Sequence, residues 1–101
     1  MELSGKHRRY LRALAHDLSP IVIVGRDGLT PAVYEAVKRG LLDHELIKVK
    51  LGDGAGEDRH AAASQLATAT QSEIAQVLGK IVLLYKPHPE TPSLKLPSRP
   101  R

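Results

Sequence analysis

Four residues of the chain, Gly25-Arg26-Asp27-Gly28, have the types and spacing of a site for an anion. The two glycines permit a positive φ or the close approach of another molecule, because neither carries a Cβ. Arg26, at the tip, can form a charge-assisted hydrogen bond to a phosphate group. We call these four residues the glycine turn. Taken alone, these four residues are explained better by a simple turn between a strand and a helix. Evidence for an anion site has to come from other segments of the chain.

The residues on either side predict a strand and a helix that hold the glycine turn in place. Thr30 is a favoured N-cap type and Pro31 a favoured first helical residue, which predicts a helix from Pro31 to Leu42. Its free N–H groups and the positive end of its dipole would stabilise an anion at the turn. The run Ile21–Val24 is continuously β-branched, which predicts a central strand buried on both faces.

A basic amphipathic helix is predicted at the start of the chain, from Leu3 to Leu18. Its apolar side consists of Leu3, Tyr10, Leu11, Leu14 and Leu18, and its other side carries Arg8, Arg9 and Arg12, with Lys6 near the border. This basic cluster has no acidic partner four residues away, which leaves its charges available to another molecule. A solvated surface helix is the alternative, and for this segment alone it is the better explanation.

Two lysines lie on one face of a second predicted strand, Leu46–Leu51. Its apolar residues alternate with Lys48 and Lys50, as in a half-exposed strand. The lysines are either a guard against edge-to-edge aggregation or part of a phosphate-binding surface, and the sequence favours neither reading.

The remaining pattern completes an α/β fold. A glycine-rich linker at 52–56 precedes an alanine-rich helix at 57–70, and Gly79-Lys80 joins two apolar runs into a hairpin. The order helix, strand, helix, strand, helix, strand, strand predicts a mixed four-stranded sheet packed with three helices, with parallel pairing within each strand-helix-strand unit. We expect one domain at 1–86 and an extended, mobile, Pro-rich basic tail at 87–101.

Composition narrows the classes of function. A net charge of +4 favours an acidic partner such as nucleic acid, but three Tyr without Phe or Trp argue against a platform for stacking bases. The absence of Cys excludes thiol chemistry, and the five scattered His predict no metal site. No secretory signal or membrane-spanning run is evident, so we expect a cytoplasmic protein without membrane contact. No catalytic motif is present, and we expect no enzyme, no cofactor and no small-molecule substrate.

Several blocks of the chain, taken in order, resemble the CRM domain of the small bacterial YhbY-like RNA-binding proteins. They are Leu3-Ser4-Gly5-Lys6 with Arg8-Arg9-Tyr10-Leu11-Arg12-Ala13-Leu14-Ala15-His16, Val24-Gly25-Arg26-Asp27-Gly28-Leu29-Thr30, His44-Glu45-Leu46-Ile47-Lys48-Val49-Lys50, and Val77-Leu78-Gly79-Lys80-Ile81-Val82-Leu83 with Tyr85.

The resemblance implies a fold similar to the C-terminal domain of bacterial translation initiation factor 3. It also implies association with precursors of the large ribosomal subunit and contact with RNA through a GxxG loop, here Gly25 to Gly28. The family loop usually carries a basic residue followed by Asn, where this chain has Asp27. Its carboxylate either folds back to accept N–H groups within the turn or faces the phosphate.

The sequence therefore predicts a non-enzymatic protein that binds RNA, with ribosomal RNA as the partner, through the glycine turn and a neighbouring basic helix. The expected RNA-binding residues are Lys6, Arg8, Arg9, Arg12, Gly25, Arg26, Asp27, Gly28, Thr30, Lys48 and Lys50. The main alternative is a protein-interaction module that docks its basic helix on an acidic or ribosomal protein surface. A small enzyme with affinity for anions is the second alternative.

Overall fold

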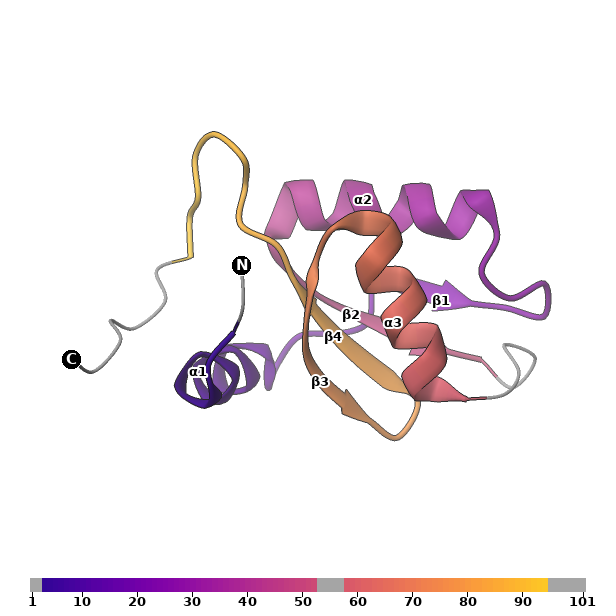
Figure 1. Cartoon of the computed structure of the whole chain (residues 1–101), viewed down its shortest axis with the longest axis horizontal. Coiled ribbons are helices and arrows are strands. Elements are labelled where there is room, and N and C mark those ends of the chain that lie inside the picture. Colours follow the sequence, from indigo (N-terminus) through magenta and orange to yellow (C-terminus); the bar gives the residue numbers. More distant parts are fainter. Residues whose placement is uncertain (1–2, 53–57, 95–101) are drawn as a thin grey trace.

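The seven predicted elements follow one another in the predicted order in a computed structural model that describes residues 3–52 and 58–94 (Figure 1). They are α1 (Gly5–Ala15), β1 (Val22–Val24), α2 (Pro31–His44), β2 (Leu46–Leu51), α3 (Arg59–Thr70), β3 (Glu73–Leu78) and β4 (Ile81–Tyr85). Most of the predicted glycine-rich linker lies outside the described residues, as does the end of the predicted tail from residue 95.

The four strands form one mixed sheet in the order β1-β2-β4-β3. β1 pairs with β2 in parallel, whereas β4 is antiparallel to both of its neighbours, β2 and β3. The predicted α/β class with a mixed four-stranded sheet and three helices is confirmed. The predicted parallel pairing within the second strand-helix-strand unit is wrong, because β4 lies between β2 and β3 and pairs with both.

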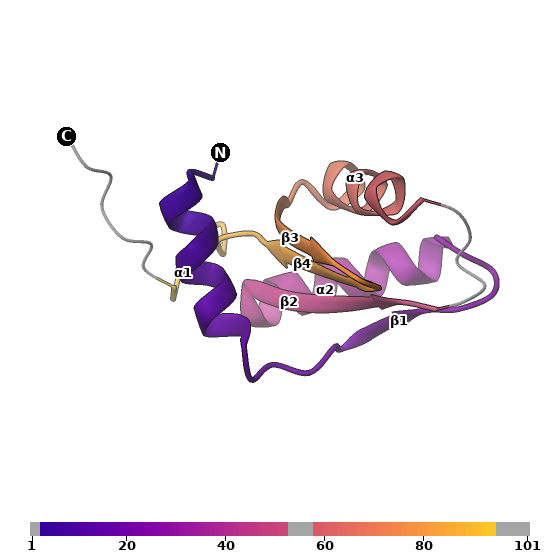
Figure 2. The same ribbon diagram turned by 90° about the horizontal axis from the view of Figure 1, so that it is seen from below.

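The helices cover the two faces of the sheet unequally. α2 and α3 pack on one face, while α1 crosses the other face at one end only (Figure 2). The larger core, under α2 and α3, includes Val24, Val37, Leu41, Val49, Leu66 and Leu84. The smaller core, under α1, includes Leu3, Leu11, Ala15, Leu46, Leu83 and Tyr85. Within residues 3–52 and 58–94, no helix covers the part of this second face beyond α1.

The prediction that the first strand is central and buried on both faces is wrong. β1 is an edge strand, and only Val22 and Val24 point into the larger core. Ile21 and Ile23, on the other face, are 50% and 65% exposed. These two side chains are exposed because α1 covers only one end of this face and lies too far along the sheet to bury them.

β2 is a central strand, so an edge guard cannot explain its two lysines. It forms a ladder with β1 on one side and with β4 on the other. Its position leaves the second reading, in which Lys48 and Lys50 contribute to a basic surface.

α1 is shorter than predicted and has a different inner face. Ser4 caps it through a hydrogen bond that its Oγ accepts from the His7 N–H (3.1 Å). His7, Leu11 and Ala15 are its buried residues, whereas Leu14 is 41% exposed. The helix therefore rests on the sheet along a narrow line and leaves both flanks accessible.

The expectation of an extended tail from residue 87 needs correction for residues 87–94, which fold back onto the body. The buried Glu45 carboxylate accepts backbone hydrogen bonds from the N–H groups of His88 (2.6 Å), Ser93 (2.7 Å) and Leu94 (2.9 Å). Leu94 packs against the smaller core. This segment is therefore held by one carboxylate at the C-terminal end of α2.

Candidate nucleic-acid interface

The glycine turn connects β1 to α2 through a hydrogen-bonded turn. The Gly28 N–H donates to the Gly25 carbonyl (3.1 Å), and the Thr30 N–H donates to the Gly28 carbonyl (3.0 Å). Thr30 caps α2 by accepting the Val33 N–H at its Oγ1 (3.2 Å), and Pro31 is the first helical residue. The local prediction for the helix start is confirmed, because N-cap and proline chemistry act within a few residues.

The two glycines of the turn differ in what requires them. Gly28 has a φ of 72°, a conformation that strains any residue with a Cβ. Gly25 does not have a positive φ, and a Cβ built there would meet no atom within 4 Å. Nothing within the described fold therefore requires glycine at position 25, which is the behaviour expected where another molecule approaches the backbone.

Several groups at the turn have no partner among the described residues. The backbone N–H groups of Arg26, Asp27 and Leu29 donate to no described atom, and the exposed Arg26 guanidinium makes no hydrogen bond or ion pair there. They stand beside the N-terminus of α2, where the helix dipole is positive. The turn can therefore present both amides and a cation to an anion.

Asp27 does not brace the turn from inside. Its carboxylate is exposed and accepts no hydrogen bond from the part of the chain that the structure describes. Of the two conformations that the sequence left open, the structure thus has the one in which the negative charge is free to meet a bound anion.

We expect Asp27→Asn to increase affinity for RNA by about two- to fivefold, because the change removes a charge that repels phosphate at an exposed site. Fluorescence anisotropy with a labelled RNA would measure the change at low salt. Glu90→Gln is the control, since it removes an equal charge at an exposed site of the 87–94 segment. Equal affinity of the Asp27→Asn variant and the wild type would show that Asp27 does not face the RNA.

α1 supplies a second group of cations, but Arg8 is not among its free ones. Its guanidinium is half-buried and donates to the carbonyls of Leu3 (Nη1, 2.9 Å) and Ile74 (Nε, 3.4 Å). The prediction that Arg8 lies on the solvent side with its charge unengaged is therefore wrong. The physical reason is that α1 rests on the sheet at His7, Leu11 and Ala15, which turns Arg8 toward β3.

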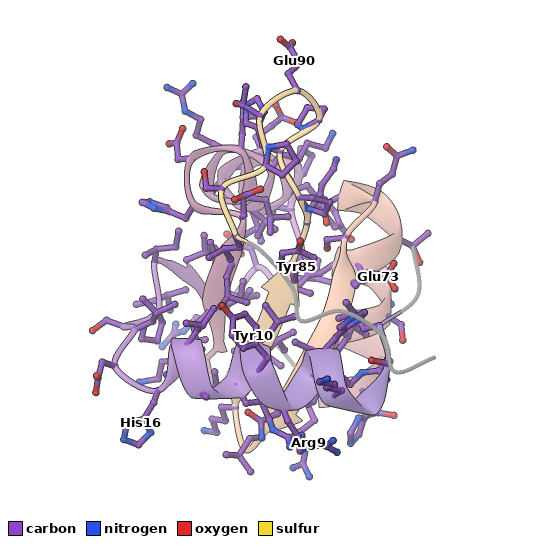
Figure 3. All side chains as sticks on the ribbon, turned by 90° about the vertical axis from the view of Figure 1, so that its left-hand side faces the viewer. Arg9, Tyr10, His16, Glu73, Tyr85 and Glu90 are labelled. Carbon is purple, nitrogen blue, oxygen red and sulfur yellow. The ribbon has the colours of Figure 1, made fainter. Side chains whose placement is uncertain are left out.

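Arg9 and Arg12 are exposed and have no partner among the described residues. Figure 3 shows Arg9 projecting from α1 on the side away from Tyr85 and the sheet. Lys6 is also exposed, but it already interacts with another part of the protein, so we do not count it among the available charges. The outer side of α1 is therefore basic, with Arg9 and Arg12 as its available charges.

The two lysines of β2 have different surroundings. Lys48 is half-buried, and its Nζ donates to the Leu18 carbonyl (2.9 Å), which ties β2 to the connection between α1 and β1. Lys50 is exposed and makes no ion pair or hydrogen bond through its side chain with the described residues. Lys50 is thus the lysine of this strand whose charge remains available.

The structure separates the two elements that the sequence placed side by side. α1 lies at one end of the sheet, and the glycine turn lies at the other end of β1 (Figures 1 and 2). The four steps from Ile21 to Gly25 span roughly 13 Å at about 3.3 Å per residue. A ligand that contacts both elements must therefore extend along the sheet, with Lys50 on its way.

Comparison with known protein families shows the family to which the chain belongs. The model of the CRS1/YhbY (CRM) domain matches residues 3–86. The chain belongs to this family. The match covers α1, the glycine turn and all four strands of this CRM domain, and it ends just before the segment that Glu45 holds.

Relatives of similar length carry names that refer to RNA. "Probable RNA-binding protein YqeI" of Bacillus subtilis is 35% identical over 95 residues, which are 94% of this chain and 99% of that protein. An "RNA-binding protein" of Haemophilus influenzae is 35% identical over 97 residues, 96% of this chain and 97% of the other. A solution structure of a Staphylococcus aureus protein, described as a candidate RNA binding protein, superposes with a TM-score of 0.80 at 35% identity, covering 95% of this chain and 100% of that one.

Two features of this CRM domain could not be predicted from its sequence. One is the role of Glu45, which only the position of residues 88–94 reveals. The other is the exposed apolar face that begins at Ile23, for which the β-branched run gave the opposite signal. Neither feature has a local sequence pattern that distinguishes it.

Neither a candidate metal site nor a membrane-spanning helix occurs among the described residues. Within residues 3–52 and 58–94, no three His, Asp or Glu side chains are grouped so that they could hold a metal ion. None of the helices in this part of the CRM domain has the length and apolar character that crossing a membrane requires.

Proposed function

We propose that this protein binds RNA without catalysis, through contacts to the phosphate backbone at the glycine turn and along the outer side of α1. The observation that carries the proposal is the turn itself, where Arg26 and three backbone N–H groups have no partner among the described residues. The names of the relatives support the same class of partner. Such contacts position an RNA strand but do not read its sequence.

The residues proposed to contact RNA follow from their availability. Arg9, Arg12, Arg26 and Lys50 are exposed cations on α1, the glycine turn and β2, Gly25 permits close approach, and Gly28 and Thr30 shape the turn. Lys6 contributes to the basic side of α1. Arg8 and Lys48 support the site indirectly, because their side chains hold α1 and the α1–β1 connection to the sheet.

The dependence of RNA affinity on salt tests this proposal. Each phosphate contact should add about 0.7 to 0.9 to the slope of log affinity against log salt concentration. A wild-type slope of about 2 or more, reduced by about 0.7 in Arg26→Ala, is the expected result. A slope near zero in the wild type would contradict a phosphate-binding function.

We extend the proposal to ribosomal RNA in precursors of the large ribosomal subunit, in the cytoplasm, on the basis of the likeness to YhbY-like proteins. Crosslinking in cell extract, followed by sequencing of the attached RNA, should recover large-subunit ribosomal RNA. Association with ribosomal particles that survives RNase treatment would favour the alternative in which α1 docks on a protein.

A further inference from the structure

The face of the sheet that α1 leaves open carries a row of large side chains across all four strands. In the registers of the sheet, Ile23 lies opposite Lys50, Lys50 opposite Ile81, and Ile81 opposite Leu78. Directly opposite residues of neighbouring strands point to the same face, so these four side chains form one continuous row. We call it the open row.

The open row is accessible, and three of its four side chains are apolar. Ile23 is 65% exposed and Leu78 66% exposed, while Ile81 is half-buried between its neighbours. Isolated exposed apolar residues are common on proteins, but here Ile81 and Leu78 are adjacent, and Ile23 lies beyond Lys50 on the same face. Exposed apolar side chains grouped on one uncovered face are the kind of surface that interacts with another molecule.

The open row lies between the two parts of the proposed RNA site. Ile23 is two residues before Gly25, so one end of the row adjoins the glycine turn. On its other side is α1, which covers Leu46, Leu83 and Tyr85 and leaves the row uncovered. A strand of RNA that bridges the turn and α1 would therefore pass over or beside this row.

Arg12 and Leu14 are both exposed residues of α1. Leu14 lines a cavity of about 430 Å³ whose lining also includes Ile21, Lys48 and Leu94. Positions two residues apart in an α-helix are separated by about 200° around its axis, so Arg12 and Leu14 project in nearly opposite directions. Arg12 on α1, Lys50 in the open row and Arg26 at the glycine turn are all exposed cations.

The chemistry of the row favours RNA with unpaired bases. A base-paired helix presents phosphates and 2′-hydroxyls on its outside, which aliphatic side chains would desolvate without compensation. Unpaired bases offer apolar faces that can lie against Ile23, Ile81 and Leu78, while Lys50 meets a phosphate. A second copy of the chain fits less well, because the row holds no acidic residue and a symmetric contact on it would bury Lys50 without an opposite charge from the row.

We propose that the open row is the floor on which single-stranded RNA lies as it passes from α1 to the glycine turn. The inference rests on the proposed function and narrows its ligand to unpaired RNA. Because the contacting side chains are aliphatic, they should discriminate unpaired from paired RNA more than one base from another.

The test compares two labelled RNAs by fluorescence anisotropy, a single strand of about 12 nucleotides and a duplex of the same sequence. Ile23→Gln combined with Leu78→Gln makes the row polar at positions exposed enough to tolerate the change. The matched control is Leu42→Gln, at a 48% exposed leucine on α2, away from the row. Melting temperatures show whether each variant folds.

We expect the wild type to prefer the single strand, and the double variant to lose about tenfold in affinity for it with little change for the duplex. Leu42→Gln should change neither affinity by more than about twofold. A folded double variant with wild-type affinity for the single strand would overturn the proposal, as would a wild type that prefers the duplex. Arg26→Ala separates the two ideas: if it weakens binding while the double variant does not, the proposed function stands and the open row is not part of it.

Discussion

Replacing Glu45 by glutamine should lower the free energy of unfolding by about 2 kcal/mol. The Glu45 side chain is buried, and its two carboxylate oxygens accept three backbone hydrogen bonds from His88, Ser93 and Leu94. Glutamine would replace one of these acceptors with an NH₂ group, which cannot accept, and a buried donor would lose its partner. Chemical denaturation followed by circular dichroism would measure the loss.

Glu90→Gln is the matched control, because it removes a carboxylate from the same segment at an exposed position whose side chain makes no hydrogen bond with the described residues. It should unfold like the wild type. Wild-type stability of the Glu45→Gln variant would instead mean that residues 87–94 are not held by this carboxylate.

The same carboxylate should make stability depend on pH. Burial raises the pKa of Glu45, but the backbone hydrogen bonds from His88, Leu94 and Ser93 outweigh burial and hold the pKa below its usual 4.5. A carboxyl group whose pKa is lowered by folding contributes its stability fully above the unfolded value. That contribution should be lost as the pH falls below about 4.5 and through the folded pKa. In Glu45→Gln this part of the acid dependence should be missing.

Replacing Arg9, Arg12 and Arg26 together by alanine should weaken RNA binding by roughly 30-fold at moderate salt, or about 2 kcal/mol. These three exposed cations have no partner among the described residues, so their removal breaks no contact within the described fold. The slope of log affinity against log salt should fall by about 2, since three phosphate contacts are lost. Filter binding across a salt series would measure both quantities.

Arg39→Ala serves as the control for the triple variant, because this arginine is on α2 and already pairs with Asp43 (3.3 Å). It should change RNA affinity little. A triple variant that binds RNA with an unchanged salt slope would contradict the proposed interface, provided that its melting temperature matches that of the wild type. Arg8 is left intact in this design because its hydrogen bonds to Leu3 and Ile74 would confound binding with stability.

Local features of this protein could be predicted from the sequence because their physical causes act over a few residues. Thr30 and Pro31 start α2 as predicted, and Gly79, with a φ of 57°, closes the predicted hairpin. Element order and type followed from hydrophobic periodicity in the same way. The glycine turn could be located by its residue types, and the groups that we propose to bind an anion depend only on its own backbone and on the start of the next helix.

The arrangement of these elements was decided by contacts between residues distant in the chain. Whether Ile23 is buried depends on which strand lies at the edge and where α1 crosses the sheet, and the β-branched run Ile21–Val24 is the same in either case. Arg8 and Arg9 are adjacent in sequence, yet only the packing of α1 determines that the first is bound to carbonyls and the second is free.

The sequence by itself determined the family, the order of the elements and the chemistry of the glycine turn. Only the tertiary structure decided that the turn and α1 lie at opposite ends of the sheet, that an apolar row lies open between them, and that Glu45 holds residues 88–94. The physical reason is that periodicity and capping report the state of a short segment, whereas strand order and helix placement minimise exposed apolar surface over the whole molecule.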